Sequence, residues 1–173
     1  MENMELLILR LVHIFTGAFW VGATLYLAIF ILPAVKALGP DGSKFMAQLM
    51  KTKKLPLFMN IVSLLNILSG LRLIMILTDS FRSTGWFATH YGISISIGMV
   101  AALGAFTISF TVSRPTANKM NSIGAAIAAA GGPPTAEQVQ QLGVLRTKIF
   151  KSILIMAWHL AAALAFMSLA KYL

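Results

Sequence analysis

The stretch that decides the fold is LLILRLVHIFTGAFWVGATLYLAIFIL, which extends from Leu6 to Leu32 and contains one charged residue, Arg10. An α-helix needs about 20 predominantly apolar residues to cross the hydrocarbon core of a bilayer, so this stretch is long enough to span a membrane. Glu2 and Glu5 precede it where a signal peptide would carry basic residues, and Pro33 follows it in place of a small-residue cleavage site. We therefore expect a retained membrane-spanning helix.

Three further stretches have the same apolar character. They run from Leu55 to Leu77, from Trp86 to Val112 and from Ile149 to Leu169. Over the whole chain 58% of the residues are hydrophobic and only 11% are charged, whereas soluble domains are about 25% charged. Cysteine is absent, which excludes disulfides, a thiolate nucleophile and Cys-ligated metal clusters. The prediction is one all-α integral membrane domain over residues 1–173, folded as a four-helix bundle.

The basic residues concentrate in the segments after the first and third spans. They are Lys36, Lys44, Lys51, Lys53, Lys54, Arg114, Lys119, Arg146, Lys148 and Lys151. The positive-inside rule places these segments in the cytoplasm and both termini on the outer, periplasmic side, as in a multi-pass protein of a bacterial inner membrane. Because topology and anionic lipid headgroups account for the net charge of +9, the expected partner is the lipid bilayer and not nucleic acid.

The two basic segments are expected to be partly helical. The run from Gly39 to Ser43 has turn chemistry, with Asp41 or Ser43 as the cap of a short amphipathic helix that begins at Lys44. In the second segment, Thr135 and Gln138 have the spacing of a capping box. The helix that this box opens would continue through the fourth span for roughly 50 Å, so its first turns would project into the cytoplasm.

Each span has one face of polar or small residues. These faces are Arg10, His13, Gly17, Trp20 and Thr24 in the first span; Asn60, Ser63, Asn66 and Gly70 in the second; His90, Ser94, Gly98, Ala102 and Ala105 in the third; and Ser152, Ile155, His159, Ala162 and Phe166 in the fourth. Polar groups are costly in lipid, so these faces are expected to line the bundle interior. The small residues of the third span would let a neighbouring helix, a flat ligand or the partner in a homodimer or larger membrane complex approach closely.

Histidines within the spans, with arginines toward the outer surface, favour a haem b site. The candidate cofactor-binding residues are His13, His159, His90, Arg10, Arg72, Gly17 and Trp20. His13 would be one axial ligand, with His159 or His90 opposite, and the arginines would neutralise the propionates. Counted along the helices, His90 lies near the outer surface, His13 about 10 Å deeper and His159 nearer the midplane. His13 therefore does not lie at the same membrane depth as either of its possible partner ligands.

Two other interpretations of the histidines stay open. His13, His159 and His90 could together hold a metal such as copper or zinc, or each could hydrogen-bond to a serine or asparagine on a neighbouring helix. In the second case the chain is a non-catalytic membrane subunit or a partner-binding protein. The spans contain no acidic residue, which argues against hydrolase chemistry and proton-coupled transport, and no catalytic residue is assigned.

The sequence resembles several families of small bacterial membrane proteins. His13 with its neighbours Leu11 to Phe15, followed by Gly17 and by Phe19 to Gly22, is similar to the first helix of the CopD-like copper-resistance domains and of the HemJ-like protoporphyrinogen oxidases. The resemblance implies that His13 matches the haem-holding histidine of the HemJ-like group, or a copper link in the CopD-like group. The lysine that the HemJ-like group carries on its third helix has no counterpart here.

A nearly end-to-end resemblance is to a four-span bacterial family of uncharacterised function (DUF2269-like). It rests on the Gly39-Pro40 turn, on Gly131 to Thr135 and on the closing Ala170 to Leu173. This resemblance implies a four-helix membrane fold but brings no activity.

Overall fold

The computed structural model describes residues 2–173, all of whose regular structure is helical. The elements are α1 (Glu2–Tyr26), a π-helical turn (Leu27–Ile31), α2 (Leu32–Ala37), α3 (Pro40–Ala47), a second π-helical turn (Gln48–Thr52), α4 (Leu55–Leu77), a 3-10 turn (Thr84–Ala88), α5 (His90–Ile108), a third π-helical turn (Ser109–Ser113), α6 (Arg114–Ala130), α7 (Ala136–Leu169) and a closing 3-10 turn (Ala170–Tyr172).

Four continuous helical segments are long and apolar enough to cross a membrane. They are Met4–Leu38, Leu55–Leu77, His90–Ala130 and Ala136–Tyr172. The four expected apolar helices are therefore confirmed. The first and third are longer than predicted, because π-helical turns join α1 to α2 and α5 to α6 without a break. The fourth begins in the preceding polar segment, as the sequence predicted.

Local capping explains where these helices begin. Thr135 accepts a hydrogen bond from Gln138 N at 3.2 Å while the Gln138 side chain accepts one from Thr135 N at 2.9 Å, so the predicted capping box is confirmed. The third span begins later than predicted. Trp86 lies in a 3-10 turn, and α5 starts at His90 because the Thr89 hydroxyl caps it by accepting from Gly92 N.

The prediction for the first basic segment was wrong in its boundary. The run after Gly39 is helical, α3 beginning at Pro40, and neither Asp41 nor Ser43 is the cap. Gly39 is the residue before the helix and has φ +56°, a conformation that glycine adopts without strain. Proline at the first helical position has the backbone angle that a helix needs, so this Gly-Pro pair starts a helix instead of forming a turn.

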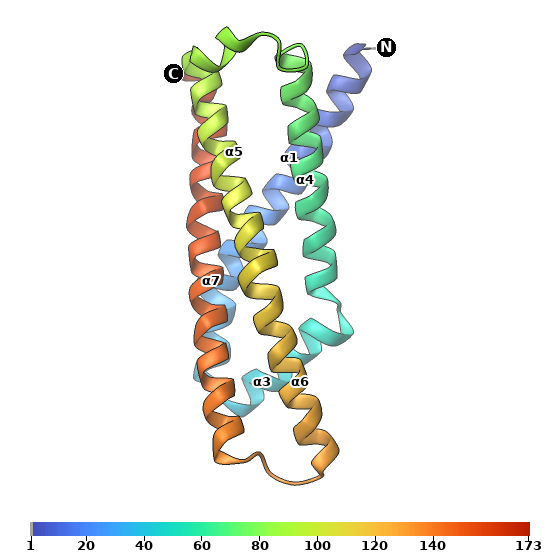
Figure 1. The fold of residues 1–173 in the computed structure, drawn as a ribbon, viewed down its shortest axis with the longest axis vertical. Helices are drawn as coiled ribbons and strands as arrows, with labels where there is room; N and C mark the ends of the chain where they lie inside the picture. The colour runs from blue at the N-terminus through green and yellow to red at the C-terminus, as the bar shows by residue number, and fades with distance from the viewer. Residues whose placement is uncertain (1) are drawn as a thin grey trace.

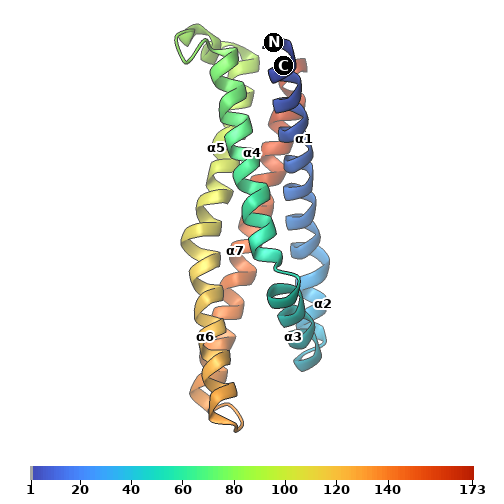
Figure 2. The ribbon, with the colours of Figure 1, turned by 90° about the vertical axis from the view of Figure 1, so that its right-hand side faces the viewer.

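The helices are arranged as two pairs (Figure 1). α1 packs along α4 and α5 packs along α7, while the pairs meet mainly through α1 and α7, and α4 touches α5 little. Both termini lie at the same end of the bundle, and α6 with the first half of α7 extends beyond α3 at the other end (Figure 2). Side chains that belong to different pairs therefore meet mainly along the α1–α7 contact.

Trp20 is at the centre of the buried core. Its side chain is 2% exposed, and it clusters with Val21 of α1, Val62 of α4, Ala105 of α5, and Met156 and Leu160 of α7. All four long helices thus contribute to this layer. The indole of Trp20 is surrounded by apolar helix side chains and packs the bundle.

Small residues bring α5 close to α7. Ser94, Gly98, Ala102 and Ala105 are all buried. A Cβ added at Gly98 would lie 2.7 Å from Met167 Cγ and 3.2 Å from the Ala163 carbonyl oxygen of α7. The small-residue face of the third span is therefore occupied by the chain's own fourth span.

We expect Gly98→Leu to lower the free energy of unfolding by about 1–3 kcal/mol, because the added side chain would push α5 away from α7. The matched control is Gly22→Leu on α1, where an added Cβ would meet nothing within 4 Å. Thermal unfolding followed by circular dichroism in detergent measures both variants. Equal melting temperatures for the two would contradict the close packing at Gly98.

Candidate functional site

His13 lies between α1 and α4 and is hydrogen-bonded to α4. Its Nδ1 is 2.9 Å from the main-chain oxygen of Asn66 and 3.3 Å from Ser69 Oγ. A carbonyl oxygen can only accept, so Nδ1 carries the proton and donates it to Asn66 O. The other ring nitrogen, Nε2, is then the one with a free lone pair.

The Asn66 side chain makes the reciprocal contact. Its Nδ2 donates to the main-chain oxygen of His13 at 2.8 Å and to Thr16 Oγ1 at 3.3 Å. Ser69 in turn donates to Leu65 O within α4 at 2.7 Å. Two side chains that each bond to the other's main chain fix the register of α1 against α4. We call His13, Thr16, Asn66 and Ser69 the interhelical polar cluster.

Two glycines make room for the interhelical polar cluster. A Cβ at Gly70 would lie 2.7 Å from His13 Cε1, and a Cβ at Gly17 would lie 2.9 Å from Asn66 Nδ2. Without side chains at these positions, the imidazole rests against α4 and the amide rests against α1. Gly17, a candidate for making room for a cofactor, is therefore filled by Asn66.

His159 belongs to the other helix pair. Its Nδ1 donates to Ile155 O, one turn back in α7, at 2.9 Å. Its ring lies against Gly104 of α5, where an added Cβ would be 2.8 Å from His159 Cδ2. His13 and His159 thus face different neighbours, α4 and α5, which touch each other little.

The contacts also place the two histidines at different depths. His13 packs on Gly70, which precedes the end of α4 at Leu77 by seven residues. His159 packs on Gly104, which follows the start of α5 at His90 by fourteen residues. At 1.5 Å per residue the two rings are separated by about 10 Å along the bundle, with His159 the deeper of the two, as the sequence predicted. Two axial ligands must reach the same iron atom, and His13 and His159 lie at different depths.

His90 does not join either of the other histidines. It is the first residue of α5, and its side chain is exposed at the end of the bundle that holds both termini. Within residues 2–173, no three or more His, Cys, Asp or Glu side chains come close enough to hold a metal ion. The three candidate metal ligands His13, His90 and His159 are therefore held in three separate places.

Arg72 and Arg10 are the two arginines that were expected to neutralise the haem propionates. Arg72 is paired with Glu5 of α1, with its Nη2 2.7 Å and its Nε 2.8 Å from the Oε1 of that carboxylate. This ion pair is the charged counterpart of the interhelical polar cluster, because it also joins α1 to α4. Arg10 is exposed on α1. An Arg72 already neutralised by Glu5 is a poor partner for a propionate.

The buried face of the fourth span differs from the predicted one. Ser152, Met156, Ala157, Leu160 and Ala163 are buried, whereas Ile155 and Phe166 are exposed. Ser152 was predicted correctly, but from there the packed face continues through Met156 and Leu160, whereas the predicted face continued through Ile155 and His159. An apolar helix gives little periodic signal, so two polar residues were an insufficient guide.

Three residues that matter for this region were missed from the sequence. Thr16 and Ser69 lie next to His13 and Asn66 in space, and Glu5 was treated only as a residue preceding the first span. Only a weak signal in the sequence could have indicated the pairing of Glu5 with Arg72: the two residues lie at a similar membrane depth on successive helices. The expected hydrogen bond between a histidine and an asparagine of the neighbouring helix is confirmed for His13 and Asn66.

Comparison of the chain with protein-family models, with curated proteins and with solved structures gives no match.

We expect Asn66→Ala to lower the free energy of unfolding by about 1–2 kcal/mol, because two interhelical hydrogen bonds from its amide are lost. Asn60→Ala, on the same helix, is the matched control: Asn60 is only partly buried, so its change should stay within about 0.5 kcal/mol. Reversible unfolding in mixed micelles measures both. The role assigned to Asn66 fails if the two substitutions cost the same.

Proposed function

We propose that this chain is a non-catalytic, multi-pass membrane subunit, in which the polar residues of the spans hold the helices together and the apolar flanks face lipid or a partner protein. The observation that carries the proposal is the interhelical polar cluster, in which His13 and Asn66 bond to each other's main chain across α1 and α4. Among the described residues, no buried side-chain nitrogen or oxygen lacks a hydrogen-bond partner. Polar groups in lipid need such partners, and here helix packing supplies them.

The proposed orientation places both termini outside, in the inner membrane of a bacterium. The basic segments form the end of the bundle opposite the termini, where α3, α6 and the start of α7 lie. Lysine and arginine concentrate on the cytoplasmic side of membrane proteins. The helical extension of α6 and α7 would then stand in the cytoplasm, available to a partner there.

The outward faces of the spans support contact with lipid or another membrane protein. Ile14, Phe15 and Val100 are each more than 60% exposed, and Trp158 is 71% exposed. In water such a surface would be unfavourable, at about 25 cal/mol per Å² of apolar area. In a bilayer this apolar surface is solvated by the lipid chains, and it can equally be the contact face of a larger membrane complex.

A second candidate, haem binding or a redox accessory role, is favoured by one feature of His13. Because Nδ1 donates to Asn66 O, the ring has the tautomer that leaves Nε2 free, and metal-ligating histidines commonly have their other ring nitrogen bonded to a carbonyl in this way. The residues present fit one axial ligand but not the second, since His159 and His90 lie elsewhere. A haem held by two histidines of one chain therefore does not fit this arrangement, and the structural role is preferred.

An absorption spectrum of the purified protein separates the two proposals. We expect a colourless protein both as isolated and after dithionite, even after expression with added haem precursor. His13→Ala should then lower stability and leave the spectrum unchanged, while His90→Ala, at an exposed position, should change neither. A Soret band with sharp reduced α and β bands that His13→Ala abolishes would establish haem binding and contradict the non-catalytic proposal.

The absence of cysteine allows a clean test of the orientation. We expect Ser83→Cys, between α4 and α5, to react with a membrane-impermeant maleimide on intact spheroplasts. Ser122→Cys, on α6, should react only after the membrane is permeabilised. Both serines are exposed, so accessibility is set by the side of the membrane. The reverse labelling pattern would overturn the positive-inside assignment.

A further inference from the structure

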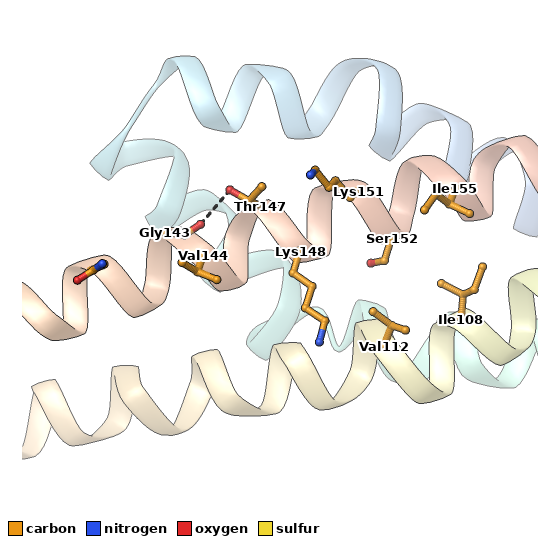
Figure 3. Close-up of a pocket in the computed structure, with 10 residues that line it drawn as sticks. Ile108, Val112, Gly143, Val144, Thr147, Lys148, Lys151, Ser152 and Ile155 are labelled. Atoms are coloured by element: carbon orange, nitrogen blue, oxygen red, sulfur yellow. Dashed lines mark hydrogen bonds between the residues drawn. The ribbon is translucent and has the colours of Figure 1, made fainter.

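A groove lies along one side of α7 (Figure 3). Its volume is about 690 Å³. The residues that carry the following argument are Ile108, Val112, Val144, Lys148, Lys151 and Ile155. The groove is thus open and mainly apolar, and it lies between α7 and the helix formed by α5 and its π-helical extension. Two lysines line it.

The apolar and basic parts of the groove lie at different depths. Ile155 comes from the apolar portion of α7, and facing it are Ile108 and Val112 from the last turns of the third span. Lys151 and Lys148 follow on α7 toward the end of the bundle that carries the basic segments. The groove therefore runs from the hydrocarbon level of the proposed membrane to the headgroup level.

The two lysines line the groove, and neither forms an ion pair with the described residues. Lys148 extends from α7 toward the helix that carries Val112, while Lys151 leaves α7 in another direction (Figure 3). The ion pairs found among residues 2–173 are Lys44 with Asp41 and Arg72 with Glu5, and neither includes these lysines. Lys148 and Lys151 are about one helical turn apart on α7, so both add positive charge to this end of the groove.

We propose that this groove binds an anionic phospholipid of the cytoplasmic leaflet. The phosphate lies beside the ammonium group of Lys148, and Lys151 adds positive charge at the edge of the groove. One acyl chain lies against Ile108, Val112 and Ile155. Charge complementarity commits the site to an anionic lipid, because basic pockets between spans on the cytoplasmic side bind such headgroups. The inference rests on the membrane orientation proposed above, but it does not depend on whether the subunit also binds haem.

Native mass spectrometry of the full chain, stripped of lipid in detergent, tests the site with dioleoyl phosphatidylglycerol. Dioleoyl phosphatidylcholine, whose headgroup is zwitterionic with no net charge, is the comparison. We expect phosphatidylglycerol to bind more tightly. The double variant Lys148→Gln/Lys151→Gln should weaken its binding roughly 10- to 30-fold, as expected for two lysines near a headgroup. Lys53→Gln/Lys54→Gln, which removes the same charge from the other basic segment, should change it less than twofold. Val112→Trp should block both lipids by filling the apolar part.

Three results would overturn the lipid site. They are equal affinity for the two lipids, equal weakening by the two lysine pairs, which would indicate only diffuse attraction, and undiminished phosphatidylglycerol binding by Val112→Trp. Circular dichroism and the melting temperature confirm that each variant is folded. Failure of the orientation is detected separately by the cysteine labelling, and failure of the non-catalytic role is detected by the haem spectrum.

Discussion

The structure depends on one constraint: a polar side chain inside an apolar bundle must find its partner within the protein. His13 and Asn66 satisfy this constraint reciprocally, each bonding to the main chain beside the other. The close approach that these bonds require is possible because Gly17 and Gly70 have no side chains. The same helix pair is joined a second time by Glu5 and Arg72, nearer the termini. Hydrogen bonding and charge therefore specify the α1–α4 pair, whereas small residues and apolar packing specify the α5–α7 pair.

The sequence was sufficient for the fold class and insufficient for the site. Four apolar stretches predicted four helices, because the need to bond every backbone group in lipid leaves few other structures. The capping box at Thr135 was correct because it depends on residues three apart. The phase of the fourth span was wrong, since an apolar residue such as Ile155 is stable on either side of the helix. The pairing of Arg72 with Glu5 joins positions 67 residues apart, and no local pattern indicates it.

The division into two helix pairs also explains why residues that share a predicted interior do not form one site. His13 faces α4, His159 faces α5, and Trp20 occupies the layer where all four helices meet. Histidine, glycine and tryptophan on one helical face are consistent with a cofactor site and with tight packing. The residues that contact this face from the other helices distinguish a cofactor site from tight packing. Here the neighbours are an amide, a serine hydroxyl and apolar core side chains, which favours packing.

The central claim is that the His13 imidazole bonds α1 to α4 through Nδ1. Solid-state nuclear magnetic resonance of the lipid-embedded protein, with ¹⁵N in histidine and ¹³C in the asparagine carbonyl, measures it directly. We predict a protonated Nδ1 on His13, an Nε2 without proton or metal, and dipolar coupling between Nδ1 and the Asn66 main-chain carbonyl, consistent with the 2.9 Å contact to its oxygen. An unprotonated Nδ1 without that coupling, or an Nε2 shifted by coordination to a metal, would contradict the account.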